Sequence, residues 1–347
     1  MHGIIARYRA RLPVSGKTPV ITLLEGDTPL VPAPRLAEAV GLPEDSVLLK
    51  LEGANPTGSF KDRGMTLAVS KALEEGAKGV LCASTGNTAA SAAAYAARAG
   101  LPCVVVLPAG KVASGKLAQA LMHGASVLAV QGGFDEALRL SLEAAREDGW
   151  TVVNSTNPYR LQGQKTASFE ISEALGRMPD YQFMPVGNAG NITAYWMGYR
   201  ELQGPRPAMM GFQAAGAAPL ALGRPVASPK TVATAIRIGK PFSWKAAVRA
   251  RDESGGLLDK VTDREILSAY RFLAEKEGVF CEPSSAAGVA GLLKHRGGLK
   301  RRDGLRVVCI LTGHWLKDPE APALLKHRVR RVPADAAAIR RALRCGR

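Results

Sequence analysis

Short apolar runs recur along nearly the whole chain, and several of them are apolar at consecutive positions. The run CVVVLP at 103–108 has no alternation with polar residues, which is typical of a strand that is covered on both faces of a parallel sheet. The same pattern predicts strands at 47–52, 79–84, 103–108, 126–131, 151–156, 181–187 and 307–313.

Amphipathic stretches with helical spacing lie between these runs. They predict helices at 61–75, 87–99, 133–148, 161–175, 190–203, 263–277 and 285–296. Strands that alternate with helices are typical of parallel sheets with crossover helices. The chain is therefore predicted to be an α/β protein of two doubly wound domains, each a mostly parallel sheet flanked by helices.

Pro, Asn, Ser and Thr cluster near 53–56 and again near 152–158, and these clusters indicate where the chain passes between domains. We predict a smaller α/β domain at 54–153 that is inserted in a larger one made of 1–53 and 154–325. The Gly-, Pro- and Ala-rich stretch 214–256 is predicted to be a long irregular connection. A basic tail at 326–347 completes the organisation.

The chain has 347 residues and a net charge of +16, and its last 22 residues hold eight Lys or Arg and one Asp. Binding of a polyanion without catalysis is one explanation of this charge. A solvated basic surface is simpler, because only 5% of residues are aromatic and no nucleic-acid-binding motif is present. No apolar run reaches the roughly 18 residues of a membrane helix. The first residues do not resemble a secretory signal, so a cytoplasmic protein without a membrane or nucleic-acid partner is expected.

The five cysteines are odd in number, and no two stand in the C-x-x-C spacing of a metal site. Cys82, Cys103 and Cys309 fall in predicted strands, where a reduced cysteine behaves as a small apolar residue. Cys281 lies closer to polar residues in VFCEPSSAAG, so both a buried packing role and a nucleophilic role are open for it. No metal site is predicted.

Three polar loops each follow a predicted strand: STGNTAAS at 84–91, GNAGN at 187–191 and TGHWLKDP at 312–319. In open α/β sheets, ligands bind at the carboxyl ends of strands. A small-residue turn before a helix, such as GNAGN, lets backbone N–H groups converge on an anion, although a plain tight turn has the same composition. It matches neither the Walker loop nor G-x-G-x-x-G, which disfavours ATP and dinucleotides. The loop at 84–91 suits a carboxylate or phenolate oxygen, or else a helix cap.

Lys61 stands at the start of a predicted helix in NPTGSFKDRG, residues 55–64. The helix dipole disfavours a cation there, and partial burial lowers the pKa of an amine toward its neutral, nucleophilic form. A solvated surface lysine is the simpler alternative. A neutral lysine forms Schiff bases with aldehydes. Together with an anion-binding loop and the strand-end hydroxyl of Thr312, it meets the requirements of pyridoxal phosphate.

The motifs NPTGSFKDRG, STGNTAASAAAYAARAG, NPYRLQGQKTASFEI, GNAGN and LTGH, taken in order, resemble those of the threonine synthases. These are fold-type II pyridoxal-phosphate enzymes of the tryptophan synthase beta-like superfamily, and the similarity runs from about Thr28 to about Pro319. The resemblance implies that pyridoxal 5'-phosphate lies in the cleft between the two domains. It also implies conversion of O-phospho-L-homoserine and water to L-threonine and phosphate by γ-elimination and β-addition, in a homodimer.

The resemblance also implies roles for individual residues. Lys61 would form the Schiff base, Asn87 would bind the cofactor 3'-oxygen and Thr312 the pyridine nitrogen. The cofactor phosphate would lie on Gly187, Asn188, Ala189, Gly190 and Asn191. The substrate carboxylate would be bound by Ser84, Thr85 and Thr88, and the substrate phosphate by Lys116, Asn154, Ser155, Arg160 and Asn188.

Three points stay open: the reaction, the role of Arg160 and the orientation of Trp315. A serine/threonine dehydratase has a similar pattern around the lysine, but it binds no second phosphate, so Lys116 and Arg160 would have no ligand. Arg160 could instead pair with a carboxylate as part of the structure. Trp315 stands where these enzymes have a small residue, and its ring could either narrow the site or face outward.

Overall fold

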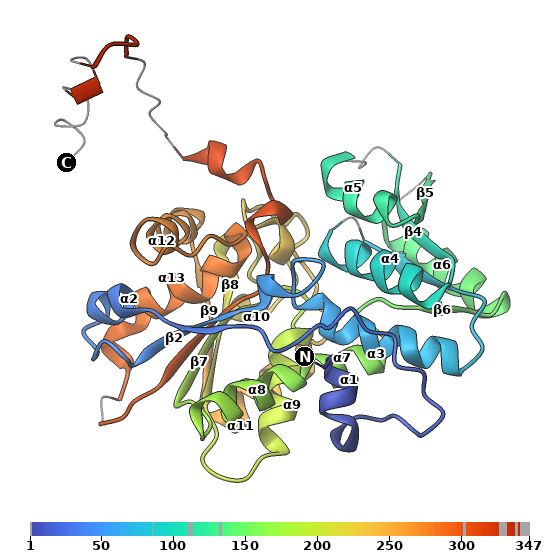
Figure 1. Cartoon of the computed structure of the whole chain (residues 1–347), viewed down its shortest axis with the longest axis horizontal. Coiled ribbons are helices and arrows are strands. Elements are labelled where there is room, and N and C mark those ends of the chain that lie inside the picture. Colours follow the sequence, from blue (N-terminus) through green and yellow to red (C-terminus); the bar gives the residue numbers. More distant parts are fainter. Residues whose placement is uncertain are drawn as a thin grey trace.

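The computed structural model of the chain describes residues 2–84, 86–109, 114–131, 134–300, 303–325, 332–336 and 339–340. Two sheets, each with its own helices, lie on opposite sides of the molecule (Figure 1). None of the helices in these ranges has the length and apolar character that crossing a membrane requires. Most of the predicted basic tail lies outside the described residues.

The larger sheet has six strands in the described part of the chain, in the order β1-β2-β10-β7-β8-β9. All neighbouring strands are parallel except β1, which runs antiparallel to β2 at the edge. The strands are β1 (Leu30–Pro32), β2 (Val47–Leu51), β7 (Tyr181–Pro185), β8 (Ala208–Ala214), β9 (Leu257–Val261) and β10 (Val307–Leu311).

The smaller sheet has four parallel strands among the described residues, in the order β5-β4-β3-β6. They are β3 (Gly79–Ala83), β4 (Cys103–Pro108), β5 (Ser126–Val130) and β6 (Trp150–Val152). All four come between β2 and β7 in the sequence. This sheet therefore falls within the predicted inserted domain at 54–153, whose boundaries stay a prediction.

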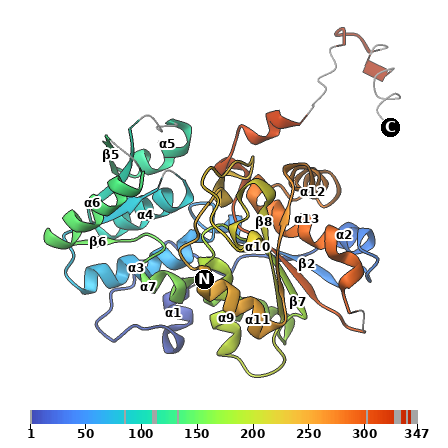
Figure 2. The same ribbon diagram turned by 180° about the vertical axis from the view of Figure 1, so that it is seen from behind.

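Helices connect the strands and cover both sheets. They are α1 (Ile4–Arg7), α2 (Pro34–Ala39), α3 (Lys61–Glu74), α4 (Asn87–Ala99), α5 (Ser114–Met122), α6 (Phe134–Glu147), α7 (Pro158–Gln164), α8 (Thr166–Leu175), α9 (Gly190–Arg200), α10 (Pro219–Leu222), α11 (Trp244–Ser254), α12 (Asp263–Lys276) and α13 (Ala286–His295). Helices α3 and α7 pack against each other near the junction of the two halves, as the view from behind also shows (Figure 2).

Strand β10 shows why the sequence has uninterrupted apolar runs. Val307, Cys309 and Leu311 join the core beneath α2, α12 and α13, and the alternate residues Val308 and Ile310 join the core beneath α8, α9 and α11. A strand that is buried on both faces needs apolar side chains at every position. The predicted fold class, an α/β protein with two mostly parallel sheets flanked by helices, is confirmed.

Strands form at all seven predicted places, but β6 covers only the first two residues of the stretch predicted at 151–156, and β1, β8 and β9 were not predicted. Gly211 interrupts the apolar run of β8, because a Cβ at this position would lie 2.6 Å from Leu258 Cδ2 of β9. Strand β9 carries Asp259 and Lys260, so it lacks the apolar continuity by which the other strands were recognised.

Two helix predictions need correction. The helix predicted at 161–175 is two helices, α7 and α8, which are separated at Lys165. The stretch 214–256 is not one irregular connection, because it contains α10 and the eleven-residue α11. Helix α11 holds several charged residues and turns only Ala247 and Ala250 fully inward, so its apolar stripe is too narrow to stand out in the sequence.

Candidate functional site

The predicted lysine loop is joined to the end of β10. The Phe60 backbone N–H donates to the Thr312 carbonyl at 3.1 Å, and the His314 N–H donates to the Gly58 carbonyl at 2.9 Å. These bonds form a short antiparallel bridge between Ser59 and Gly313. Lys61, the first residue of α3, is thereby placed beside the strand-end residue Thr312.

Asp62 holds the turn that precedes Lys61. Its carboxylate accepts hydrogen bonds from the Thr57 backbone N–H at 2.7 Å and from the Thr57 hydroxyl at 2.6 Å. The Ser91 hydroxyl of α4 donates to the same carboxylate at 2.6 Å. Burial raises the pKa of Asp62 to about 6. The turn is thus fixed both to its own helix and to the first helix after β3.

The Lys61 amine is kept from bulk water. The side chain is partly buried, and its Nζ lies 4.1 Å from the centre of the Phe60 ring. Removal of water lowers the pKa of Lys61 to about 7, and the nearby positive charge of Arg160 acts in the same direction against the opposing effect of Glu282. An amine with this pKa is neutral in a large fraction of molecules near neutral pH, as a nucleophile or general base requires.

Asn87 and Thr312 both contact Glu282, a residue that was not among the predicted site residues. The Asn87 amide Nδ2 donates to both carboxylate oxygens of Glu282, at 3.3 and 3.2 Å. The Thr312 hydroxyl lies 3.5 Å from Glu282 Oε1 and 3.0 Å from the Ser285 hydroxyl. Glu282 follows Cys281 directly, and a lone acidic residue before Pro-Ser-Ser in an otherwise apolar run was the available signal.

The loop at 187–191 has the geometry of an anion site. Ala189 adopts a left-handed conformation with φ 64°, and α9 begins at the next residue. The Asn188 amide donates to Ser155 Oγ at 2.9 Å and accepts from the Phe242 N–H at 2.7 Å. Both amide atoms of the buried Asn191 lack a hydrogen-bond partner among the described residues. Buried polar atoms without partners are rare in folded proteins, so these two atoms are available to a ligand or to water at this loop.

These observations match the chemistry of pyridoxal phosphate. The loop offers an anion site at the start of an eleven-residue helix, and Asn191 supplies unsatisfied polar atoms there. Lys61 supplies an amine of lowered pKa for the aldehyde. The Thr312 hydroxyl at the end of β10 is suited to a ring nitrogen, so the residues present fit this cofactor.

The residues expected to bind the substrate phosphate differ in how many of their polar groups are already hydrogen-bonded within the protein. The Asn154 amide donates to the Ala83 carbonyl and accepts from the Ala83 N–H, both at 2.9 Å, so it extends the contacts between β3 and the chain after β6. Ser155 accepts the bond from Asn188. Arg160 is 1% exposed and donates from Nη1 to the Val153 carbonyl at 3.0 Å, while its Nε has no partner among the described residues.

Arg160 makes no ion pair with a carboxylate in the described ranges, so the structural pairing considered for it is not seen there. Ser84 and Thr88 are partly buried at the end of β3 and the start of α4, and the Ser84 hydroxyl accepts from the Gly86 N–H at 3.3 Å. Thr85 and the side chain of Lys116 lie outside the described residues.

Close packing of α3 on α7 places Arg160 near Lys61. A Cβ added to Gly163 would lie 1.9 Å from the Arg63 carbonyl oxygen, and one added to Gly64 would lie 2.8 Å from the Arg160 carbonyl oxygen. Only glycine permits backbones to approach this closely. The glycines of NPTGSFKDRG and NPYRLQGQ therefore bring the two motifs into contact.

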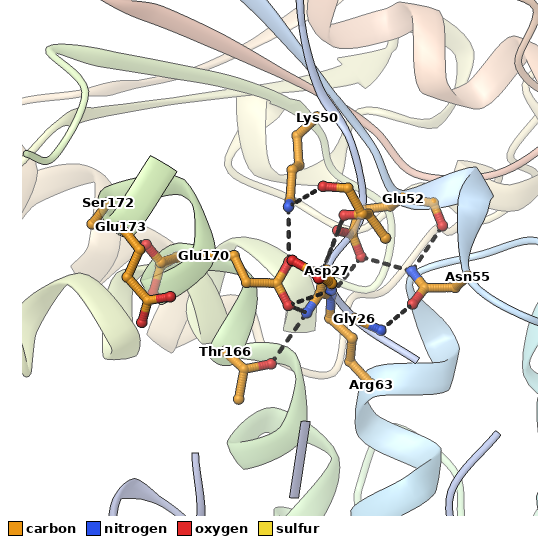
Figure 3. A network of polar contacts seen from close by, with 12 residues as sticks. Gly26, Asp27, Lys50, Glu52, Asn55, Arg63, Thr166, Glu170, Ser172 and Glu173 are labelled. Carbon is orange, nitrogen blue, oxygen red and sulfur yellow. Dashed lines mark hydrogen bonds and ion pairs between the residues drawn. The ribbon is translucent and has the colours of Figure 1, made fainter. Parts of the chain in front are cut away.

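A buried ion network anchors the same end of α3 (Figure 3). Arg63 Nε contacts Glu52 at 2.7 Å and Arg63 Nη2 contacts Glu170 at 2.6 Å, while Lys50 Nζ reaches Glu170 at 2.8 Å. Glu52 follows β2 and Glu170 lies on α8. The network ties the lysine-bearing helix to the large sheet, and the sequence reasoning missed it because its members are far apart in the chain.

The surroundings of Trp315 and Cys281 fit a role in packing for both side chains. The Trp315 ring is half-buried and stacks on Phe280 with ring centres 5.3 Å apart, which accounts for its bulk by a contact with another aromatic residue. Cys281 is buried, and burial raises the pKa of its thiol, which disfavours the nucleophilic thiolate. The packing role considered for this cysteine therefore agrees with its environment.

Comparisons with known proteins agree with this geometry. Residues 21–313 match the model of the pyridoxal-phosphate dependent enzyme family. The chain is 59% identical to the threonine synthase of Synechocystis sp. over 92% of its length and 84% of that protein. It is 55% identical to the threonine synthase of Mycobacterium leprae, covering 97% and 94% of the two chains. Among solved structures, maize serine racemase superposes with a TM-score of 0.76 at 21% identity over 99% of this chain and 97% of that one, a similarity of fold.

Proposed function

The chain belongs to the threonine synthase family of pyridoxal-phosphate-dependent enzymes, and on this premise we propose that it converts O-phospho-L-homoserine and water to L-threonine and phosphate. The observation that supports this most strongly in the structure is the Lys61 amine, whose pKa is lowered to about 7 beside the end of β10. The amine has the reactivity that the cofactor aldehyde requires.

We propose that four groups hold the cofactor. Lys61 binds the aldehyde carbon, Asn87 the 3'-oxygen and Thr312 the ring nitrogen, while the backbone and amide groups of 187–191 bind the phosphate. When bound, pyridoxal phosphate supplies an electron sink that stabilises negative charge at the substrate carbon next to the amino group. A hydroxyl at Thr312 holds the ring nitrogen less firmly protonated than a carboxylate would, so the electron withdrawal is mild.

Lys61 is also the group that moves protons. The Lys61 amine would take the proton from the substrate Cα and would transfer protons at Cβ. A pKa of about 7 suits both directions, because the amine can accept and return a proton near neutral pH. Phosphate leaves from Cγ, and water adds at Cβ. Protons returned to Cα and Cγ complete L-threonine.

The substrate is held at its two ends by the surrounding loops. Ser84, Thr85 and Thr88 are proposed for the carboxylate. Asn188 and Ser155, already joined to each other at 2.9 Å, are proposed for the phosphate together with Lys116, Asn154 and Arg160. The unpartnered Nε of Arg160 leaves one donor of a planar guanidinium for this purpose. Because these residues come from both sheets, closure of the two halves on the substrate would exclude water.

The direct test is an assay of the purified protein with O-phospho-L-homoserine. Threonine and inorganic phosphate should appear in equal amounts, and Lys61→Ala should abolish both products and the yellow colour of the bound cofactor. Lys78→Ala, which removes an exposed lysine, is the matched control and should keep both. Release of 2-oxobutanoate from threonine, with no phosphate released from phosphohomoserine, would assign the chain to the dehydratases instead.

We also propose that the protein works in the cytoplasm as a homodimer. The four described cysteines Cys82, Cys103, Cys281 and Cys309 are free thiols, which fits a reducing compartment. The dimer rests on the family resemblance alone. Light scattering during size-exclusion chromatography would determine it, and a mass of a single chain at micromolar concentration would contradict it.

A further inference from the structure

Glu282 is the buried carboxylate at which the ends of β3 and β10 meet, and the proposed mechanism does not use it. The residue is 3% exposed and lies at the start of the short helix η5 (Pro283–Ser285). We propose that Glu282 is a positioning residue that orients the Asn87 amide, so that an N–H of this amide and the Thr312 hydroxyl face the same bound ring. The inference rests on the proposed cofactor role of Asn87 and Thr312.

The contact with Asn87 selects one of the two orientations of the amide. An ionised carboxylate only accepts hydrogen bonds, whereas an amide presents a donor on one side and an acceptor on the other. Both Glu282 oxygens lie 3.2 to 3.3 Å from Asn87 Nδ2. With Nδ2 drawn to this side, the second hydrogen on the same nitrogen is available to the 3'-oxygen of the ring. The reversed amide would bring Oδ1 against the carboxylate, and two acceptors repel.

The backbone around Thr312 is fitted to the same carboxylate. The Glu282 N–H donates to the Gly313 carbonyl at 3.0 Å. A Cβ at Gly313 would lie 2.6 Å from Glu282 Oε1, so a larger residue would displace the carboxylate. Ser285 Oγ accepts from the Gly313 N–H at 3.0 Å and shares a hydrogen bond with Thr312. One carboxylate therefore determines the spacing between Asn87 and Thr312.

The charges around Glu282 are mixed. Burial raises the pKa of Glu282, and the negative charge of Asp318 acts in the same direction, while the hydrogen bond from Asn87 and the positive charges of Lys317 and Lys61 oppose the shift. Cys281 is its neighbour in sequence, and the pKa of that thiol is itself raised by burial. The bond from Asn87 thus favours the ionised form of a carboxylate whose burial disfavours it, and loss of this donor leaves the carboxylate in a less favourable environment.

The substitution Glu282→Gln tests the orientation of the Asn87 amide while it leaves the packing of side chain 282 nearly unchanged. Glutamine has nearly the same shape but can present either a donor or an acceptor to Asn87, so it no longer selects the amide orientation. We expect the dissociation constant of pyridoxal phosphate, measured by absorbance titration of the apoprotein, to rise about tenfold. Cofactor affinity equal to that of the unchanged protein would overturn the inference.

A double-mutant cycle identifies the route of the effect. If Glu282 acts through Asn87, then Glu282→Gln should weaken cofactor binding by less than about twofold in an Asn87→Ala background. A full tenfold effect in both backgrounds would show that Glu282 acts independently of Asn87. Glu253→Gln, at a surface glutamate far from the proposed cofactor groups in sequence and on a different helix, is the matched control and should leave cofactor affinity unchanged.

If Glu282→Gln does not fold, Asn87→Ala tests the contact without cofactor. Removal of the amide donor raises the pKa of Glu282 further, so the cost of keeping it ionised grows as the pH rises. The melting temperature of the apoprotein should therefore fall more at about pH 8 than at about pH 5 relative to the unchanged protein. A loss independent of pH would contradict the contact.

These results are distinguishable from failure of the proposed function. If the unchanged protein binds no pyridoxal phosphate, the proposed function fails. If it binds the cofactor and releases phosphate from phosphohomoserine while the Glu282→Gln variant is indistinguishable from it, only the positioning role fails.

Discussion

At the residue scale, the site depends on what surrounds a single amine. Lys61 has an ordinary side chain, but burial and the charge of Arg160 lower its pKa from 10.5 to about 7. The sequence indicated the position of this lysine at a helix start, and the lowered pKa follows the expected direction. Glu282, by contrast, was not selected, because the sequence shows it only as an acidic residue in an apolar run, and its partners Asn87 and Thr312 lie on other elements.

Capture of the cofactor should report this pKa. Below about pH 7 the Lys61 amine is mostly protonated, and above it the neutral nucleophile predominates. The rate at which apoprotein binds pyridoxal phosphate, followed by stopped-flow absorbance, should therefore rise with pH through a midpoint near 7. Arg160→Gln removes a positive charge and should move the midpoint upward. A midpoint close to the ordinary lysine value of 10.5 would contradict the environment described here.

At the element scale, the contact between α3 and α7 places the motif that contains Lys61. Gly163 of α7 meets the Arg63 carbonyl of α3, where any Cβ would lie at 1.9 Å. Helix α3 also contributes Met65 and Val69 to the core of the small sheet. The contact between α3 and α7 therefore links the two halves of the molecule. The position of Arg160 near Lys61 therefore depends on a glycine three residues further along α7.

Gly163→Ala should separate the helices and destabilise the fold by about 3 kcal/mol, because a close backbone contact cannot absorb a methyl group. Chemical denaturation of the apoprotein measures this. Gly16→Ala is the matched control, since a Cβ there meets nothing within 4 Å and its stability should be unchanged. Equal unfolding midpoints in the two variants would show that the close contact between Gly163 and the Arg63 carbonyl does not exclude a larger residue at position 163.

Some of the strands and helices could be predicted from the sequence and others could not. Strands such as β4 and β10 were predictable because burial on both faces leaves an uninterrupted apolar signature. Strand β8 was not, because Gly211 serves a contact with Leu258 that only the folded sheet creates. Helix α11 was not predicted either, because its buried Ala247 and Ala250 form too narrow an apolar stripe among charged residues.

At the scale of the whole molecule, buried charges join the site to the large sheet. Arg63, two residues after Lys61, contacts Glu52 and Glu170, which lie beside β2 and on α8. Arg63 and Lys50 hold the pKa of Glu170 well below its ordinary range, despite burial that would raise it. A group with a lowered pKa stabilises the fold above its unfolded-state pKa, and this contribution is lost as the pH falls.

Arg63→Met should destabilise the protein by about 3 to 5 kcal/mol at neutral pH, because it leaves two carboxylates buried without their main partner. The loss should shrink on acidification, as the unpaired carboxylates become protonated. Thermal unfolding across pH measures both effects. Arg271→Met, which removes an exposed pair with Glu275, is the control and should cost less than about 1 kcal/mol. An Arg63→Met variant as stable as the Arg271→Met control would show that the buried ion network contributes little to the stability of the fold.

The role of Lys61 can be tested by borohydride reduction of the purified protein with pyridoxal phosphate, followed by mass spectrometry of its peptides. We expect the pyridoxyl group to be attached to Lys61 and Lys78, exposed on the same half of the molecule, to stay unmodified. A pyridoxyl group distributed over surface lysines with Lys61 unmodified would contradict this role.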